Sequence, residues 1–257
     1  MKILETIPQL STVLALVITV LILASCSSSE RLLSVEDMEP ASISNQELMD
    51  LVPDYSEELE TLIGNGRAIV SEPGGSDRVT LEFQSDREKS LITIRTSIGI
   101  EGGQILVDSD SLLIYNRVDK YAEKVSLQQS NLTSIGSLAS LNMLDMFNFT
   151  INKEDILGIY ENEQVYVAVL NNRTQVTLSK SDGLIQNVVQ SGGESAYSRI
   201  DYEGYAQIEG FYLPRKITIL SSDGSSQATF LVQRLDVNNT LPPMEISIPE
   251  NIPIYRI

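Results

Sequence analysis

Hydrophobic and polar residues alternate along much of the chain with the two-residue period of a β-strand. Val79, Leu81 and Phe83 alternate with polar residues, and Ile92 and Ile94 belong to a second run of the same kind. Further strand-like runs occupy residues 104–107, 112–115, 121–125, 164–170, 175–180, 184–190, 197–205, 212–220 and 227–237. Short turn sequences separate most of these runs and leave no room for the crossover helices of a parallel sheet, so the pattern predicts an antiparallel meander.

Other stretches have the spacing of helices. Ser44 and Glu47 form the pattern of a capping box at the start of a first helix. Helical spacing resumes over residues 55–63, where a glycine ends it. An apolar stripe over residues 132–147 predicts a helical insertion between strands, and residues 153–160 predict another short helix.

These elements predict a mainly β fold of the α+β class. A large antiparallel sheet curls because its strands twist, and the curl leaves a concave apolar face. The helical segments are the elements available to cover that face. We therefore expect a single domain over residues 43–257, in which one curved antiparallel sheet forms an incomplete β-barrel and helices close its concave mouth.

The first residues are typical of an export signal. Lys2 lies beside the amino terminus, and an apolar run over residues 13–23 is too short to cross a membrane, which needs about 20 residues. The sequence Leu23-Ala24-Ser25-Cys26 follows and resembles the lipobox of bacterial lipoproteins. Residues 1–25 are thus predicted as a signal peptide. Cys26 would carry a covalent diacylglycerol and an N-acyl chain, although a signal anchor with a chance cysteine is the alternative.

Residues 26–42 are polar and acidic, and we interpret them as a tether of roughly 20–25 Å average reach. Cys26 is the single cysteine, so no internal disulfide can form. The formal net charge of −17 argues against nucleic-acid binding, because it repels phosphate backbones. It also implies that contact with a membrane is made through the lipid anchor rather than through a basic patch.

Several classes of catalytic site are excluded by residue content. The chain has no histidine, which excludes Ser-His-Asp and Cys-His machinery. It shows no glycine-rich phosphate loop, and its many acidic residues fit solvated helix faces and turns. Asp108 and Asp110 fit a hairpin turn better than a calcium site. We expect no catalytic residue, no metal and no cofactor besides the lipid on Cys26.

The apolar stripe over residues 132–147 has two interpretations. It packs permanently against the sheet as core, or it forms a lid over a lipid-sized cavity, for which Leu, Met and Phe offer an adaptable surface. The candidate lid residues are Leu138, Leu141, Leu144 and Phe147. The candidate cavity wall consists of Leu81, Phe83, Ile92, Ile94, Ile105 and Val107.

Residues from about 59 to 257 resemble the LolA/LolB-like superfamily of lipoprotein carriers and receptors, and within it a branch of outer-membrane lipoproteins grouped under a domain of unknown function. The stretches that carry this resemblance are Ile98-Gly99-Ile100-Glu101, Gln104-Ile105-Leu106-Val107, Asp110-Ser111, Ile114-Tyr115-Asn116-Arg117, Asp155-Ile156-Leu157-Gly158, Leu213-Pro214-Arg215-Lys216-Ile217 and Ile246-Ser247-Ile248-Pro249. The resemblance implies an incomplete antiparallel barrel whose cavity holds acyl chains. The superfamily's anchored receptor also has an exposed loop with a protruding leucine.

The resemblance and the anchor lead to one functional hypothesis. We expect a lipid-anchored, periplasm-facing, non-enzymatic protein that accepts acyl chains of lipoproteins or lipids and takes part in lipoprotein localisation or lipid transfer. Its expected location is the bacterial cell envelope, at the outer membrane, since Ser27 rather than Asp follows Cys26. A periplasmic carrier protein is a further expected partner. The alternative is an envelope interaction or stress-sensing module of the same fold that transfers nothing.

Overall fold

The computed structural model describes residues 35–96, 98–128, 132–191 and 195–256. The predicted signal peptide, Cys26 and most of the predicted tether lie outside these residues. The chain forms two units, Met1–Asp37 and Met38–Ile257, and the short 3-10 helix η1 (Val35–Asp37) belongs to the first. The second unit carries the elements that follow, and all further description concerns it.

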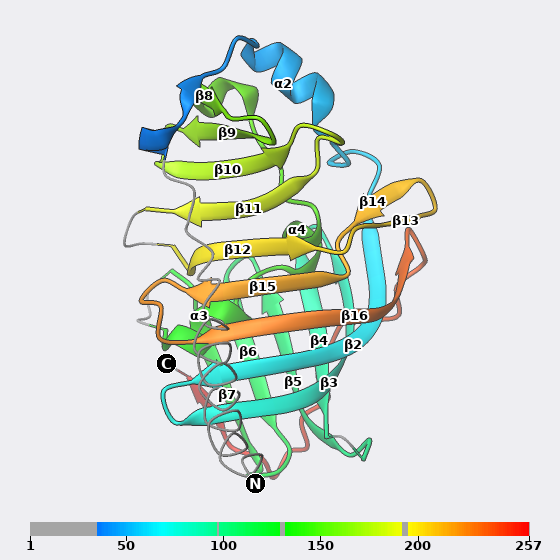
Figure 1. Cartoon of the computed structure of the whole chain (residues 1–257). Coiled ribbons are helices and arrows are strands. Elements are labelled where there is room, and N and C mark those ends of the chain that lie inside the picture. Colours follow the sequence, from blue (N-terminus) through cyan, green and yellow to red (C-terminus); the bar gives the residue numbers. More distant parts are fainter. Residues whose placement is uncertain (1–34, 97, 129–131, 192–194, 257) are drawn as a thin grey trace, which may run out of the picture. The chain divides into compact units, whose positions relative to one another are not determined.

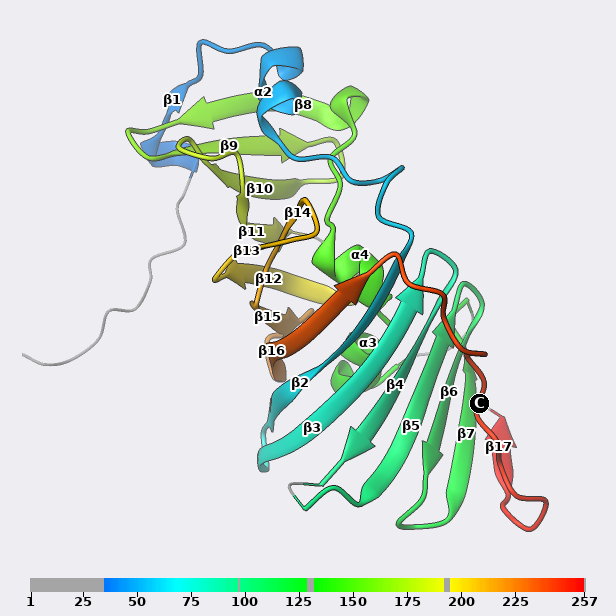
Figure 2. The ribbon, with the colours of Figure 1, turned by 90° about the vertical axis from the view of Figure 1, so that its right-hand side faces the viewer.

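Within the described residues, fifteen strands form one sheet (Figures 1 and 2). In spatial order they are β1 (Glu39–Pro40), β8 (Ile156–Glu161), β9 (Val165–Leu170), β10 (Thr174–Ser179), β11 (Ile185–Gln190), β12 (Tyr197–Glu203), β15 (Lys216–Ser221), β16 (Gln227–Val237), β2 (Thr61–Glu72), β3 (Gly75–Asp86), β4 (Lys89–Arg95), β5 (Glu101–Asp108), β6 (Ser111–Asn116), β7 (Tyr121–Ser126) and β17 (Ile254–Arg256). All neighbours are antiparallel except β17 and β7. The sheet is curved and does not close, so the predicted incomplete barrel is confirmed.

Two segments from the ends of this unit occupy the edges of the sheet. β1 pairs with β8, and the amide of Ala41 donates to the carbonyl of Ile159 at 2.9 Å, so part of the predicted tether lies against the sheet. At the other edge, β17 pairs in parallel with β7, and the amide of Ala122 donates to the carbonyl of Pro253 at 2.9 Å. A separate hairpin of β13 (Ala206–Ile208) and β14 (Phe211–Leu213) interrupts the path between β12 and β15.

Three short α-helices accompany the sheet in the described residues: α2 (Asn45–Leu51), α3 (Ser134–Ala139) and α4 (Met143–Phe147). The predicted capping box of α2 is present, since Ser44 Oγ accepts from the amide of Glu47 and the Glu47 carboxylate accepts from the amide of Ser44. Figure 2 shows α3 and α4 on the inner side of the curve, between β12–β15 and β3–β5. Their positions define the layer that covers the concave face.

The predicted helix over residues 55–63 is wrong, because residues 56–58 form only a turn and β2, which passes through the middle of the sheet, begins at Thr61. Gly64, which suggested the end of this helix, and Gly66 both lie inside β2. A Cβ at Gly64 would overlap the ring of Phe83, and one at Gly66 would overlap the carbonyl of Leu231. These glycines therefore allow neighbouring strands and their side chains to approach closely, which is a known role of glycine in sheets.

The predicted helix over residues 153–160 is also wrong. Asn152 does cap a helical turn, but this is the 3-10 helix η2 (Lys153–Asp155), and β8 follows at once. Ile156 and Ile159 are buried while Leu157 is exposed, with a register shift between Ile156 and Gly158. A β-bulge of this kind shifts the alternation of buried and exposed side chains along a strand by one residue. The apolar residues of this short segment therefore have the spacing of a helix.

The interior contains one large apolar cluster that runs from β8 and β9, near one end of the sheet, to β3 and β4, and that includes residues of α2, α3 and α4. Leu62 of β2, Leu144 of α4 and Ile217 of β15 are fully buried within it. A second, smaller apolar cluster lies on β5, β6 and β7 and consists of Val107, Leu112 and Val125. Since the core lies between the concave face and the helices, the helices complete it.

Candidate functional site

The six candidate wall residues share the concave face of β3, β4 and β5. Leu81 lies opposite Ile94, and Phe83 lies opposite Ile92. Residues directly opposite on neighbouring strands point to the same face. Ile92 in turn lies opposite Ile105, and Val107 follows on the same face of β5. The structure therefore places all six on one face, four of them buried and Ile94 and Ile105 partly buried, and Val107 belongs to the second apolar cluster.

Among the candidate lid residues, Leu138 lies on α3, Leu144 and Phe147 lie on α4, and Leu141 lies in the connection between the two helices. Leu144 is 0 % exposed, while Leu138 and Phe147 are buried and Leu141 is partly buried. The ring of Phe147 stacks on that of Phe83, with centroids 5.7 Å apart. The wall and the lid thus meet directly, and the side chains between them are packed core in this conformation.

The predicted continuous helix over residues 132–147 is two helices. Asn142 begins the second one, because its Oδ1 accepts from the amides of Leu144 at 2.8 Å and Asp145 at 3.3 Å. Asparagine is among the favoured residues at a helix N-cap. This signal was present in the sequence but was masked by the continuous apolar stripe.

A buried polar cluster fixes the start of α4 to the β3–β4 hairpin. It consists of Ser85, Ser90 and Asn142, and we call it the Ser–Asn cluster. Ser85 Oγ lies 2.6 Å from Ser90 Oγ and donates to Asn142 Oδ1 at 3.0 Å. The amide of Met143 donates to Ser90 Oγ at 2.8 Å, and that of Leu144 donates to Ser85 Oγ at 3.1 Å. Both serines are 0 % exposed, so α4 is held at its first residues by bonds shielded from water.

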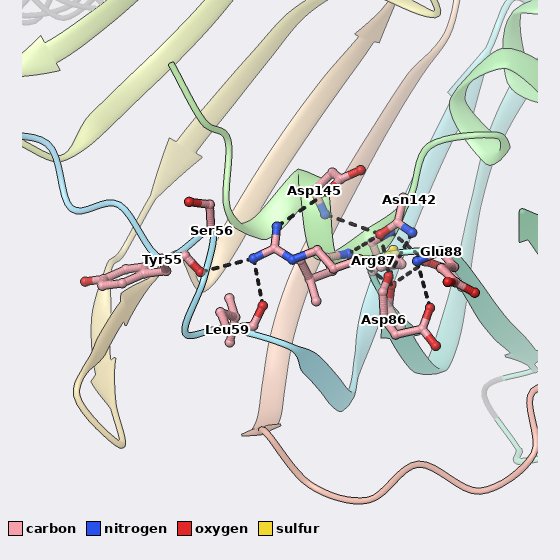
Figure 3. Close-up of polar contacts among 12 residues, drawn as sticks. Tyr55, Ser56, Leu59, Asp86, Arg87, Glu88, Asn142 and Asp145 are labelled. Carbon is pink, nitrogen blue, oxygen red and sulfur yellow. Dashed lines mark hydrogen bonds and ion pairs between the residues drawn. The ribbon is translucent and has the colours of Figure 1, made fainter. Parts of the chain in front are cut away.

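Arg87 extends this attachment to the chain segment before β2 (Figure 3). Its Nη2 donates to the carbonyls of Tyr55 at 3.0 Å and Leu59 at 2.7 Å. Its Nη1 lies 4.0 Å from Asp145 Oδ1 of α4. The side chain of Asn142 meanwhile donates to the carbonyl of Asp86 at 3.0 Å. The hairpin turn therefore joins three segments that are far apart in the sequence.

A small cavity lies beyond the other end of α4. Its lining includes Phe147, Asn148, Phe149, Ile185 and Tyr202, and its volume is about 30 Å³. An open groove of about 630 Å³ adjoins it and shares Leu184, Tyr202, Tyr205 and Tyr212 with its lining. Sequence reasoning missed this cavity, since its residues come from five separate segments with no common pattern.

A group of exposed apolar side chains lies at one end of the strands. Ile98 and Ile100, in the connection between β4 and β5, are 79 % and 61 % exposed, and Val118, in the turn between β6 and β7, is 71 % exposed. These connections lie at the same end of the sheet, because Gly103 pairs with Asn116 and Arg117 donates to the carbonyl of Gly102. We call these three residues the apolar tip.

The acidic turn at Asp108 is a structural turn. Asp108 Oδ1 accepts from the amides of Asp110 at 2.9 Å and Ser111 at 2.7 Å, which is the pattern of an Asx turn. In the part of the chain that the structure describes, no group of three or more acidic, histidine or cysteine side chains is placed to hold a metal ion. No described helix has the length and apolar character needed to span a membrane.

Comparison with protein-family models and with curated protein sequences gives no match. Solved structures give matches of fold. A domain described as an outer-membrane lipoprotein-sorting protein from Vibrio parahaemolyticus has a TM-score of 0.51 and 14 % identity, over 77 % of this chain and 92 % of that one. A LolA superfamily protein from Nitrosomonas europaea has a TM-score of 0.53 and 13 % identity, over 78 % and 96 %.

A DUF1329 family protein from Desulfovibrio piger has a TM-score of 0.50 and 10 % identity, over 77 % of this chain and 92 % of that one. Identities this low establish the fold alone. The predicted resemblance to LolA/LolB-like proteins is therefore confirmed as a shared fold.

Proposed function

We propose that this chain is a non-enzymatic, lipid-anchored protein of the bacterial envelope that accepts acyl chains between its concave sheet face and α3–α4. The observation that carries the proposal is the apolar wall of an unclosed sheet covered by two short helices. The fold shared with a lipoprotein-sorting domain and a LolA superfamily protein supports it. The lipid anchor would be attached to Cys26, and the folded domain would face the periplasm.

The covering helices are suited to move away from the sheet. α3 has six residues and α4 has five, whereas an isolated helix needs about 12–15 residues to be even marginally stable in water. Their stability must therefore come from contacts with the sheet, and an acyl chain can replace those contacts. Burying a methylene contributes about 0.8 kcal/mol, so a dozen methylenes would contribute roughly 10 kcal/mol.

The side chains on the inner face of α4 fit such an exchange. Met143 and Met146 are buried beside Leu144 and Phe147. Methionine is flexible and polarisable, and it adapts to ligands of different shape. The Ser–Asn cluster would remain as the pivot, since it holds α4 at its first residues only.

The apolar tip would add a contact with the membrane that the anchor alone does not provide. Arg95 pairs with Glu82 at 2.9 Å, and Arg117 pairs with Glu101 at 2.9 Å, so the charges beside the tip are largely neutralised. Apolar side chains at the end of a β structure can enter the headgroup region of a bilayer, as interfacial segments do. Ile98 would then have the role that the protruding leucine has in the superfamily's anchored receptor.

Photocrosslinking tests the proposal on the complete chain. The full-length protein is reconstituted in phosphatidylcholine vesicles that contain a diazirine-bearing palmitate methyl ester, and irradiated. Mass spectrometry of the peptides then locates the label. We expect label on the peptides that carry β3–β5, α3 and α4. Label confined to residues 1–42 and to exposed loops would contradict the proposal.

A pair of matched variants sharpens this experiment. Met146→Trp adds volume to the interior and should reduce interior labelling several-fold, at a cost of about 1–3 kcal/mol in stability from overpacking. Leu157→Trp makes the same kind of change on an exposed side chain of β8 and should leave labelling unchanged. Thermal unfolding of both variants identifies any effect caused by loss of fold.

One observation favours a second candidate function. Leu144 and Met143 are 0 % and 1 % exposed, so the interior is filled when α4 is in place. A permanently filled half-barrel would act as an interaction or stress-sensing module of the envelope. Absence of interior labelling in a folded protein would support that function instead.

A further inference from the structure

Two polar atoms in the interior have no hydrogen-bond partner. In the described residues, Asn148 Nδ2 and Tyr202 Oη are the buried side-chain atoms of this kind, and the two residues are 7 % and 5 % exposed. Buried polar groups in folded proteins are normally paired, because an unpaired one keeps the cost of leaving water. Both atoms belong to residues that line the same cavity at the end of α4.

Two other phenol groups of the cavity wall already have hydrogen-bond partners. Tyr205 Oη donates to the carbonyl of Ile185 at 2.7 Å. Tyr55 Oη accepts from the amide of Tyr212 at 2.9 Å, and its ring packs edge-on against Phe211. These bonds hold the wall in place, whereas Asn148 Nδ2 and Tyr202 Oη have no partner and remain available to donate to an occupant.

The position of the cavity relates it to the lid. Phe147 lines the cavity and also stacks on Phe83 of the wall. Asn148 is the next residue, and it ends α4. An acyl chain that lies between α4 and the sheet would therefore have one of its ends beside this cavity.

We propose that Asn148 and Tyr202 form a polar subsite for the carbonyl oxygen of an acyl ester or amide, and that the subsite selects these neutral groups over a free carboxylate. This inference rests on the proposed function. An amide N–H and a phenol O–H both donate, so the matching ligand atom is an acceptor. The cavity volume of about 30 Å³ exceeds the roughly 10–15 Å³ that one water requires, so a carbonyl group fits.

The charges around the cavity favour a neutral acceptor. Its lining contains no lysine or arginine, and the adjoining groove carries Asp182 and Glu203. A carboxylate there would be a buried charge without a cationic partner, which is strongly unfavourable. Burial also raises the pKa of Tyr202 well above its ordinary value, so its hydroxyl remains a neutral donor.

Competition in the photocrosslinking assay tests the inference. Full-length protein in vesicles is labelled with the diazirine ester while methyl palmitate or palmitate is added as competitor, at alkaline pH where the acid is ionised. We expect the ester to compete at least tenfold better than the acid. Tyr202→Phe and Asn148→Leu should each weaken competition by the ester roughly fivefold, the effect of one hydrogen bond, and leave that by the acid unchanged.

Tyr205→Phe is the matched control, because its hydroxyl lines the same cavity but is already paired with Ile185. It should lower the thermal midpoint and leave the preference for the ester intact. Tyr202→Phe should instead reduce the preference for the ester. Its thermal midpoint should be equal to or higher than that of the wild type, since the hydroxyl it removes has no partner.

The outcomes separate the two proposals. Equal competition by ester and acid in the wild type, or an unchanged preference in Tyr202→Phe, overturns the subsite while acyl binding stands. A wild type that takes up no interior label contradicts the proposed function and the subsite with it.

Discussion

The attachment of α4 to the β3–β4 hairpin can be tested by replacing Asn142 with alanine. The substitution removes the N-cap of α4, which typically contributes about 1 kcal/mol. It also removes the hydrogen bond from Ser85 Oγ at 3.0 Å and the bond to the carbonyl of Asp86 at 3.0 Å, each contributing about 1 kcal/mol. We expect a total loss of about 3 kcal/mol in the free energy of unfolding.

For a domain of this size, that loss corresponds to a fall of about 6–12 °C in the thermal midpoint. Hydrogen exchange monitored by mass spectrometry should show faster exchange in the peptide that carries α4, whose amides lose their shielded acceptors. Asn152→Ala is the control, because Asn152 caps η2 through the amide of Glu154 and makes that bond at an exposed site. Equal losses in the two variants would refute the view that the Ser–Asn cluster holds α4.

Two further predictions concern other attachments in the fold. Gly183→Ala should lower the free energy of unfolding in urea by clearly more than Gly224→Ala. Both glycines have positive φ (+71° and +69°), which costs an alanine about 1–2 kcal/mol at either position, but only a Cβ at Gly183 would overlap a neighbour, the carbonyl of Leu51. Equal losses in the two variants would contradict the overlap. Hydrogen bonds from Ser221, Ser225 and Ser134 hold the pKa of Asp223 below its ordinary value of 3.8. The ionised Asp223 therefore stabilises the fold fully above pH 3.8, and this stabilisation is lost as the pH falls through the lower pKa of the folded state. Wild-type protein should therefore lose more thermal stability than Asp223→Asn between about pH 5 and pH 2, and parallel curves for the two proteins would count against this link between α3 and the β15–β16 turn.

The sequence was sufficient for the class of fold because alternation is a local signal. The two-residue period of Val79, Leu81 and Phe83 follows from burial of one strand face, and the structure has that face buried. The capping box at Ser44 and Glu47 is equally local and is confirmed. The candidate wall and lid residues were placed in contact by sequence reasoning through a guess about faces, and their role in binding stays a prediction.

The errors arose where tertiary contacts decide the local structure. Gly64 permits close approach of Phe83, which lies 19 positions later in the chain, and nothing near Gly64 in the sequence indicates this. The same applies to the pair of Asn148 and Tyr202, which the folded chain brings to one cavity from the residue that follows α4 and from β12. Clusters of this kind depend on the path of the whole sheet and carry no spacing of their own.

The two short edge strands bear on whether this sheet can pair with another molecule. An uncovered strand edge presents a row of free amides and carbonyls, which is a template for pairing with another molecule. Here β17 occupies the edge of β7, and β1, which contains Pro40 and so lacks one amide donor, occupies the edge of β8. Proteolytic removal of the last residues would uncover Tyr121–Ser126 of β7, so the segment after β16 covers an edge at which the sheet could otherwise extend into another molecule.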